Sequence, residues 1–505
     1  MKSAPYFYTI AIICSINTKY SVISKHRFFI LNIFIVKKRL LLVSKCTNTI
    51  LLCNKSETEI EKLNQFIITM KKIITTIAMS AFALTTFAGG LSTNTNQHSA
   101  FVRNPARYAS LETDAIYFNP AGTAFFNEGW RLSANWQMVW QNRDITSHAD
   151  NKNYGAKIYV PVMPSAMASY TTGRWSFSGM FGITGGGGHA EFSNGLPTFN
   201  AMGNALVGPM GLSSKSSFES TQYVFSLQLG AAYRITEGLS AYVGVRGNYA
   251  TANYAGNITA VHPLAGDYAK ILELDLNQKG FAFAPIIGID YKVGNFNFAA
   301  KYEFEAVTNM KNDTKRFSSE ILAATLGDGN LDGKIGTFAA AIPSLAPLAT
   351  LESGKTLRND TPAQLSLAAS CQATSWLQAM VSGNYYFDKD ATVQSLLGGA
   401  DNNINLARNT YELAAGLEFK VCKNLLLSAG VQYTDFGITN QYTSDLNFNN
   451  DSFMTGLGGK YSINDKWDIN AGFCFAVYKE DNNSLRAATY KRDTYNATIG
   501  VDFKF

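Results

Sequence analysis

Hydrophobic and polar residues alternate with a period of two along most of the chain after residue 128. The runs 223–233, 425–433 and 467–478 are clear examples. This alternation predicts strands with one apolar face and one polar face. Fourteen such runs are present, at 130–142, 156–171, 175–189, 220–235, 239–255, 279–292, 296–308, 361–374, 376–388, 409–421, 424–437, 452–463, 467–479 and 494–505. An even number is expected for a single-chain bacterial barrel in which antiparallel strands close on themselves.

The connections between these runs alternate strictly between short and long. The short ones lie at 171–174, 236–238, 293–295, 374–375, 422–423 and 464–466. Outer-membrane barrels have tight periplasmic turns and long outer loops, whereas a soluble sandwich has no reason for this order. After residue 88 no run of apolar residues is long enough for a transmembrane helix. The pattern therefore predicts an all-β fold, a 14-stranded antiparallel transmembrane β-barrel at 129–505, ending on the aromatic Phe505.

The region before the barrel contains a secretion signal at an unusual place. Met70 is followed by Lys71 and Lys72, an apolar stretch at 73–87 and a cleavage site ending at Ala88. We therefore expect 70–88 to be a signal peptide and 1–69 to be an unstructured upstream leader, wrongly assigned to the protein. The alternative for the leader is a membrane anchor around 28–36, but that apolar run is too short to span a bilayer.

Composition supports a barrel, and the positive net charge of the whole chain comes from its first 88 residues. Aromatic residues make up 13% and charged residues only 16% of the chain, as suits lipid-facing strands with aromatic belts. Residues 1–88 carry 12 of the 43 Lys and Arg but 3 of the 37 Asp and Glu, so the remainder has a net charge of −3. No nucleic-acid partner is expected. Three scattered cysteines, Cys371, Cys422 and Cys474, do not form a disulfide framework.

Residues 89–128 lack the period of two and are predicted to fold into the barrel as an N-terminal plug, or hatch. Within them, 114–124 reads DAIYFNPAGTA, with Asn119, Pro120, Ala121 and Gly122 at its centre. This segment resembles the plug of the long-chain fatty acid outer-membrane transporter family, the FadL type. Residues 361–367 and 433–436 are also similar to family segments. The resemblance covers 89–505, although Asn-Pro-Ala alone is a weak motif and recurs at 104–106.

The resemblance implies a plugged barrel whose third strand is kinked inward, so that ligand leaves sideways through the wall into the membrane. The matching glycines in the third run are Gly182, Gly185, Gly186, Gly187 and Gly188. Consecutive glycines weaken a strand because they contribute no side-chain packing. The alternative is an ordinary bulge at the barrel rim.

Two outer loops contain apolar residues that are candidates for capturing a hydrophobic ligand. The candidates are Phe338, Ile342, Leu345 and Leu348 in one loop and Phe199, Met202, Leu206 and Met210 in the other. An apolar stretch on the outside commonly marks a binding surface, although the two loops could simply pack together. Arg103 and Arg107 in the plug are candidates for binding a carboxylate, or for ion pairs between plug and wall.

The longest outer loop also contains the spacing of a calcium loop. Asp328, Asn330 and Asp332 occupy ligand positions, but Ala339 stands where a bidentate Glu is expected, and an Asp/Gly-rich turn is the alternative. No other cofactor is expected. Only four histidines follow the signal, and Ser147 and His148 lie on opposite faces of a strand, so we expect no enzymatic activity.

Together these features predict an uptake channel in the bacterial outer membrane for hydrophobic small molecules, with long-chain fatty acids as the expected substrates. The route is capture by outer loops, passage past the plug and lateral exit through the third strand. A general diffusion porin and a structural or adhesive barrel are the alternatives. The expected partners are outer-membrane lipid and lipopolysaccharide, the hydrophobic ligand and the barrel assembly machinery, and the expected state is a monomer.

Overall fold

The computed structural model describes three short segments, 31–36, 39–44 and 50–53, and residues 93–505 except 322, 324–326, 342, 395 and 397–404. The first three are β1 (Leu31–Val36), β2 (Arg39–Ser44) and β3 (Ile50–Cys53), which pair in an antiparallel sheet of their own. They lie in the segment expected to be unstructured. Where the mature protein begins stays a prediction, because the signal peptide at 70–88 lies outside the described residues.

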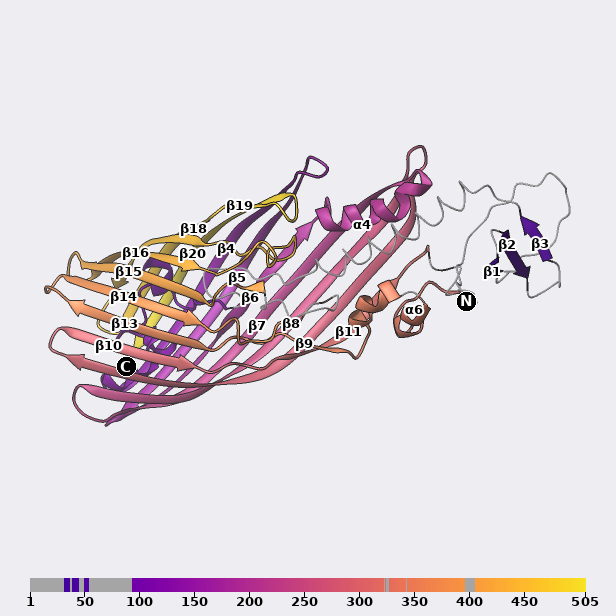
Figure 1. Cartoon of the computed structure of the whole chain (residues 1–505). Coiled ribbons are helices and arrows are strands. Elements are labelled where there is room, and N and C mark those ends of the chain that lie inside the picture. Colours follow the sequence, from indigo (N-terminus) through magenta and orange to yellow (C-terminus); the bar gives the residue numbers. More distant parts are fainter. Residues whose placement is uncertain are drawn as a thin grey trace.

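The remaining strands form one closed barrel (Figure 1). They are β4 (Gly129–Ser147), β5 (Lys152–Thr172), β6 (Trp175–Phe192), β7 (Ser213–Arg234), β8 (Leu239–His262), β9 (Gly266–Val293), β10 (Phe296–Glu303), β11 (Asn309–Ser318), β12 (Thr356–Arg358), β13 (Gln364–Gln372), β14 (Leu377–Tyr386), β15 (Thr410–Lys420), β16 (Leu425–Asp435), β17 (Ser452–Ser462), β18 (Trp467–Tyr478), β19 (Asp481–Asn483) and β20 (Ala488–Lys504).

Fourteen strands span the wall, because three of them are interrupted and appear as two pieces each. The pairs β10 and β11, β12 and β13, and β18 and β19 each continue one strand. Each strand pairs with its neighbours in sequence, and β20 pairs antiparallel with β4 to close the ring. Each of the fourteen predicted runs corresponds to one of these strands, so the predicted fold class is confirmed.

The two faces of the wall differ as the alternation predicts. Along β9, for example, Phe281, Phe283, Ile287 and Ile289 are exposed on the outside, while the alternate residues are buried inside, namely Ala282, Ala284, Ile286 and Gly288. Aromatic side chains gather in two belts on the outer surface. The belt near the short turns includes Trp130, Trp175, Tyr291, Trp376 and Trp467, and the belt towards the long loops includes Trp140, Tyr159, Tyr249, Phe281, Tyr385 and Tyr495. These belts mark the two edges of the membrane.

Strands β7, β8 and β9 extend well beyond the outer belt, as the long magenta and pink strands of Figure 1 show. The sequence predicts a loop at 256–278, but β8 and β9 continue as a hairpin to its tip between His262 and Gly266. Their outward positions are polar there because they lie above the lipid, so the membrane pattern ends before the strands do.

Residues 93–128 lie inside the barrel. They form α2 (Ser99–Arg103), α3 (Ala115–Phe118) and η1 (Pro120–Phe125), which contact strands on several sides of the ring. Almost every side chain between residues 94 and 126 is buried. A core of stacked and edge-to-face rings, Phe101, Tyr108, Tyr117 and Phe118, holds this luminal segment (residues 93–128) together.

The long loops at the outer end contain further short helices. α4 (Pro197–Val207) and η2 (Gly208–Met210) connect β6 to β7, while α6 (Ile335–Ala341) and η3 (Pro343–Leu351) lie between β11 and β12. In the part of the chain that the structure describes, no helix is both long and apolar enough to cross a membrane.

Candidate functional site: an apolar outer pocket, a packed lumen and an interrupted wall

An apolar pocket lies at the outer end of the barrel. Phe199 and Met202 of α4 form one side, and Leu348 and Leu351 of η3 contribute from the other loop. The long strands complete the lining with Phe218, Tyr254, Ile258, Leu272 and Leu274, and two further loops add Leu396 and Leu446. The two loops that the sequence singles out therefore meet in one pocket.

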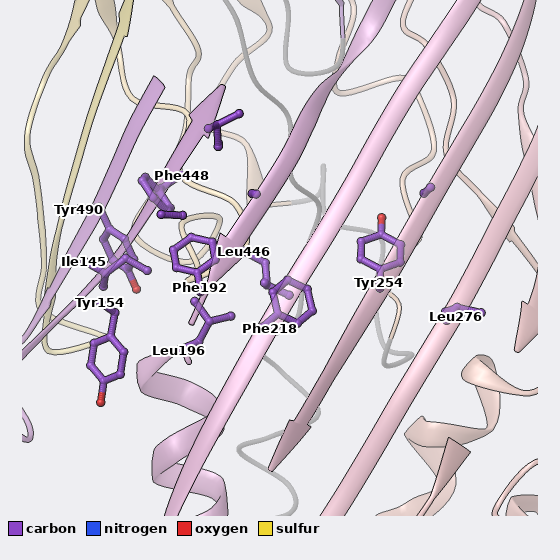
Figure 2. Close-up of a cluster of buried hydrophobic side chains, with 14 of the residues drawn as sticks. Ile145, Tyr154, Phe192, Leu196, Phe218, Tyr254, Leu276, Leu446, Phe448 and Tyr490 are labelled. Carbon is purple, nitrogen blue, oxygen red and sulfur yellow. The ribbon is translucent and has the colours of Figure 1, made fainter. Parts of the chain in front are cut away.

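The pocket continues into a large buried cluster of apolar side chains. Figure 2 shows Phe218 beside Leu446, with Tyr254 and Leu276 on the strands that follow. The ring of Phe199 meets that of Phe218 edge to face, with centroids 5.6 Å apart. Tyr254 and Asn257 are the polar residues of the lining. The Tyr254 hydroxyl accepts a hydrogen bond from Gln222 Nε2 at 2.7 Å, and Asn257 Nδ2 donates to Ser217 Oγ at 2.8 Å. Among the residues that the structure describes, the site therefore offers apolar contact and no charged group.

The other predicted loop residues have different positions. Met210 is 58% exposed and does not line the pocket. The side chains of Leu206, Phe338 and Leu345 and the whole of Ile342 lie outside the described residues. Leu272 and Leu274 could not be singled out because 256–278 is predicted as a loop, and Tyr254 because it belongs to a predicted membrane strand. Leu446 lies in a different outer loop, for which no apolar stretch is predicted.

Arg103 and Arg107 lie at the centre of a buried ionic network between the luminal segment and the wall. Both Nη1 atoms donate to Glu418 Oε1 of β15, at 2.5 and 2.7 Å. Arg107 also pairs with Asp114, at 2.7 Å from Nε to Oδ2, and Glu112 pairs with Lys460 of β17. These arginines therefore form ion pairs between the luminal segment and the wall, and a role in binding a carboxylate ligand stays a prediction.

Asn119 of the Asn-Pro-Ala-Gly motif fastens the luminal segment to the opposite wall. Its Nδ2 donates to Asp290 Oδ2 of β9 at 2.5 Å and to the carbonyl oxygen of Ser110 at 3.0 Å. Pro120 begins η1, and the carbonyl of Ala121 accepts from Ser240 Oγ at 2.8 Å. Gly122 packs so closely on Asn119 that an added Cβ would lie 2.5 Å from Nδ2. The motif is therefore a compact anchor.

We expect Asn119→Ala to loosen this anchor by about 1–3 kcal/mol, because the buried carboxylate of Asp290 loses a donor and one of its oxygens already lacks one. Hydrogen exchange of residues 93–128 measures the effect. Asn104→Ala, in the second Asn-Pro-Ala, is the matched control, since Asn104 accepts only from the nearby backbone N–H of Ala106, at 3.1 Å, and its Nδ2 reaches the Met380 sulfur, at 3.5 Å, but no wall carboxylate. Equal exchange in both variants would contradict the assignment.

The glycines of the third strand lie where β6 leaves regular pairing. The ladder between β6 and β7 shifts register between Ile183 and Gly185 and again between Gly185 and Gly188. Gly186 and Gly188 have φ angles of 97° and 71°, a region that side chains rarely adopt. An added Cβ on Gly186 would lie 2.3 Å from the carbonyl oxygen of Gln222. These positions therefore depend on glycine.

The wall is interrupted beside these glycines. The ladder between β5 and β6 runs only from Thr172–Trp175 to Ser165–Gly182, although both strands continue outward. The outer part of β5, residues 152–164, pairs only with β4. The outer part of β6, residues 183–192, pairs only with β7 and residue 93 among the residues that the structure describes.

Two prolines that were not among the predicted site residues explain why β5 stops pairing with β6. Pro161 and Pro164 lie in β5 directly above the last paired residue, Ser165. Proline has no backbone N–H to donate, so within sheets it is confined to edges and bulges. The ladder to β4 also shifts register opposite Pro161. Two prolines in one alternating run therefore indicate an unpaired strand edge from the sequence alone.

The start of the luminal segment covers the inner side of this interruption. Thr93 bridges to Gly185, and the backbone N–H of Asn94 donates to the Thr184 carbonyl at 2.7 Å. Gln97 Nε2 donates to the Ile183 carbonyl at 2.7 Å, while the Gln97 carbonyl accepts from Ser165 Oγ on β5. Residues 93–97 thus bond to the edge of β6 in place of β5.

The predicted calcium loop has its side chains engaged with protein groups. Asp328 pairs with Lys334 at 2.9 Å, and the side chains of Asn330 and Asp332 accept from backbone N–H groups. Among the described residues no group of three or more His, Cys, Asp or Glu is placed to hold a metal ion. Calcium binding stays a prediction.

A closed barrel with apolar outer strands, a filled lumen and an apolar outer pocket defines an outer-membrane channel for hydrophobic compounds. The sequence matches, over residues 79–502, the family described as outer membrane protein transport protein (OMPP1/FadL/TodX), and the chain belongs to this family. It is therefore a bacterial outer-membrane protein of a transport family and not of an enzyme class.

Solved structures share the fold at low sequence identity. A Pseudomonas aeruginosa FadL homologue is 15% identical, with a TM-score of 0.62, and the match covers 84% of this chain and all of that one. The Pseudomonas putida toluene transporter TodX is 14% identical, with a TM-score of 0.52 over 85% of this chain and 97% of that one. A search of curated protein sequences finds no match.

Proposed function

We propose that the protein takes up long-chain fatty acids and similarly apolar molecules, which enter at the outer pocket, pass the luminal segment and leave sideways between β5 and β6. The observation that carries this proposal is the apolar pocket built by α4, η3 and the long strands. Its lining suits a hydrocarbon tail, for which each buried methylene contributes about 0.8 kcal/mol. None of the described side chains that line it is charged, so a carboxylate head group would stay at the mouth.

The luminal segment acts as the plug in this proposal. It is anchored by Asn119 and by the Arg103–Glu418–Arg107 network, while its first residues lie against the interrupted wall. Residues 93–97 are held to β4, β5 and β6 by hydrogen bonds between uncharged groups, so in this proposal they move while the ionic anchors hold. A ligand in the lumen would then reach the lipid directly, without its tail crossing water on the periplasmic side.

A general diffusion porin is the alternative function, and a filled lumen argues against it. The side chains of residues 94–126 occupy the interior and contact strands all round the ring. A water-filled pore needs an open lumen lined by polar groups. A structural barrel would not need the apolar pocket at all.

Uptake by cells that lack other transporters of hydrophobic molecules tests the proposal. We expect Leu274→Asp to reduce uptake of labelled fatty acid at low concentration, because a charge in the pocket must be desolvated when the tail binds. Leu264→Asp is the matched control, since Leu264 lies at the tip of the β8–β9 hairpin with 93% of its surface exposed. Equal uptake by both variants would refute capture at this pocket.

A further inference from the structure

The outer surface of β7, β8, β9 and β11 has an ordered arrangement of polar residues above the outer aromatic belt. Tyr249 and Phe281, 45% and 55% exposed, are paired across β8 and β9 and belong to that belt. Because β9 runs inward from the β8–β9 hairpin tip, lower residue numbers on this strand lie farther outside. The next outward-facing position above Phe281 is Lys279, which therefore lies at the level of the lipid head groups.

A second lysine lies directly beside the first. Lys311 of β11 is the cross-strand partner of Lys279, and both side chains are exposed. Directly opposed side chains have Cβ atoms about 5 Å apart, and like charges in this arrangement repel. Neither lysine has an ion pair in the described part of the chain, although acidic residues occur on the same strands. Two unpaired cations at this depth suit an anion that touches both.

A polar groove lies farther out on the same face, beyond the lysine pair. Asp275 lies four residues above Lys279 on β9, which corresponds to about 13 Å along the strand. The outward-facing lining of the groove includes Glu191, Glu219, Asn257, Glu273, Asp275 and Arg316. Carboxylates, an amide and a guanidinium together accept from and donate to hydroxyl groups, as carbohydrate binding requires.

The strand registers place these groups in successive rows. Ser217, Asn257 and Glu273 are opposed in one row, and Glu219, Ala255 and Asp275 in the next row down. Arg316 is opposite Asp275 and pairs with Glu273 at 3.1 Å. The surface therefore changes, from the membrane outward, from aromatic to cationic and then to mixed polar.

We propose that this face, from Lys279 and Lys311 up to the groove, binds lipopolysaccharide, the phosphorylated glycolipid of the outer leaflet. Its acyl chains lie against the aromatic belt, a phosphate bridges the two lysines, and the first sugars enter the groove. The order of the three surfaces matches the order of the three parts of the glycolipid. A phospholipid would satisfy the lysines but leave the groove empty.

Native mass spectrometry of the purified full-length barrel tests the lysine pair, with bis-phosphorylated lipid A, its dephosphorylated form and phosphatidylglycerol as probes. We expect Lys279→Ala/Lys311→Ala to weaken binding of lipid A about tenfold, because two charge-assisted contacts are lost. Lys292→Ala/Lys466→Ala removes the same charge from exposed lysines at the other end of the barrel and is the matched control. Heat-dependent migration in gels shows that each variant is folded.

The groove is tested separately with a glycolipid that contains the core sugars. We expect this glycolipid to bind the wild type more tightly than lipid A does, and Asn257→Leu to remove the difference. Equal binding of lipid A by the wild type and the double lysine variant would overturn the proposal. Binding of dephosphorylated lipid A or of phosphatidylglycerol as tightly as lipid A would overturn it as well.

Discussion

A disulfide between Thr93→Cys and Gly185→Cys is expected to reduce uptake of hydrophobic ligand to the background of cells without the protein, and reduction should restore it. Thr93 and Gly185 are bridge partners at the interrupted wall, and directly opposed strand residues have the Cα separation that a disulfide needs. The cross-link holds the first residues of the luminal segment against β6. If ligand leaves between β5 and β6, this segment must move, so the route is closed. Uptake of labelled fatty acid under oxidising and reducing conditions measures the effect.

A second cross-link separates local movement from release of the whole luminal segment. Ser99 Oγ and Thr498 Oγ1 are 2.7 Å apart, so Ser99→Cys/Thr498→Cys ties α2 to β20 and leaves residues 93–97 free. We expect uptake close to that of the wild type from this control. Cys371, Cys422 and Cys474 are replaced by serine in both variants to avoid other pairings. Normal uptake with the first cross-link closed would refute the lateral route.

Glu418→Gln is expected to destabilise the docking of the luminal segment by about 3–5 kcal/mol, the usual cost of removing one partner of a buried ion pair. Glu418 is almost completely buried and accepts from both Arg103 and Arg107. The variant leaves two buried guanidinium groups without their shared carboxylate. Faster hydrogen exchange in residues 93–128 and a measurable ion conductance in planar bilayers are the expected results.

A matched substitution at an exposed ion pair is the control for this prediction. Glu480 pairs with Lys491 at 2.8 Å, and both side chains are about half exposed. Glu480→Gln should change stability by at most about 1 kcal/mol. If Glu418→Gln instead left exchange unchanged and increased affinity for fatty acids over neutral hydrocarbons, the arginines would be ligand contacts and not anchors.

The architecture could be predicted from the sequence because each strand carries its own signal. Alternation shows which residues face lipid, and short and long connections show which end is periplasmic. The signal fails where the environment changes, as at 256–278, because β8 and β9 extend above the membrane and their outward positions are polar. The glycines from 182 to 188 could be located, since glycine marks weak strand positions whatever surrounds it.

Contacts between distant parts of the chain could not be predicted. Asn119 and Asp290 are separated by 171 residues, and nothing in either local sequence indicates the other. Glu418 occupies an ordinary inward position of an alternating run, so its role with Arg103 and Arg107 appears only when the luminal segment is in place. Pro161 and Pro164 differ, because their missing N–H groups are a local signal that a reading of alternation alone overlooks.

Photo-crosslinking with a diazirine-bearing hydrocarbon in intact cells tests the central claim, lateral delivery of a hydrophobic ligand, most directly. The account predicts labelling of the outer pocket around Phe199 and Leu274, and of the stretches of β5 (residues 152–164) and β6 (residues 183–192) that do not pair with each other. The contrary result is labelling of the pocket and of the lumen near the short turns, with none at β5 and β6. It would show an axial route to the periplasm and contradict lateral delivery.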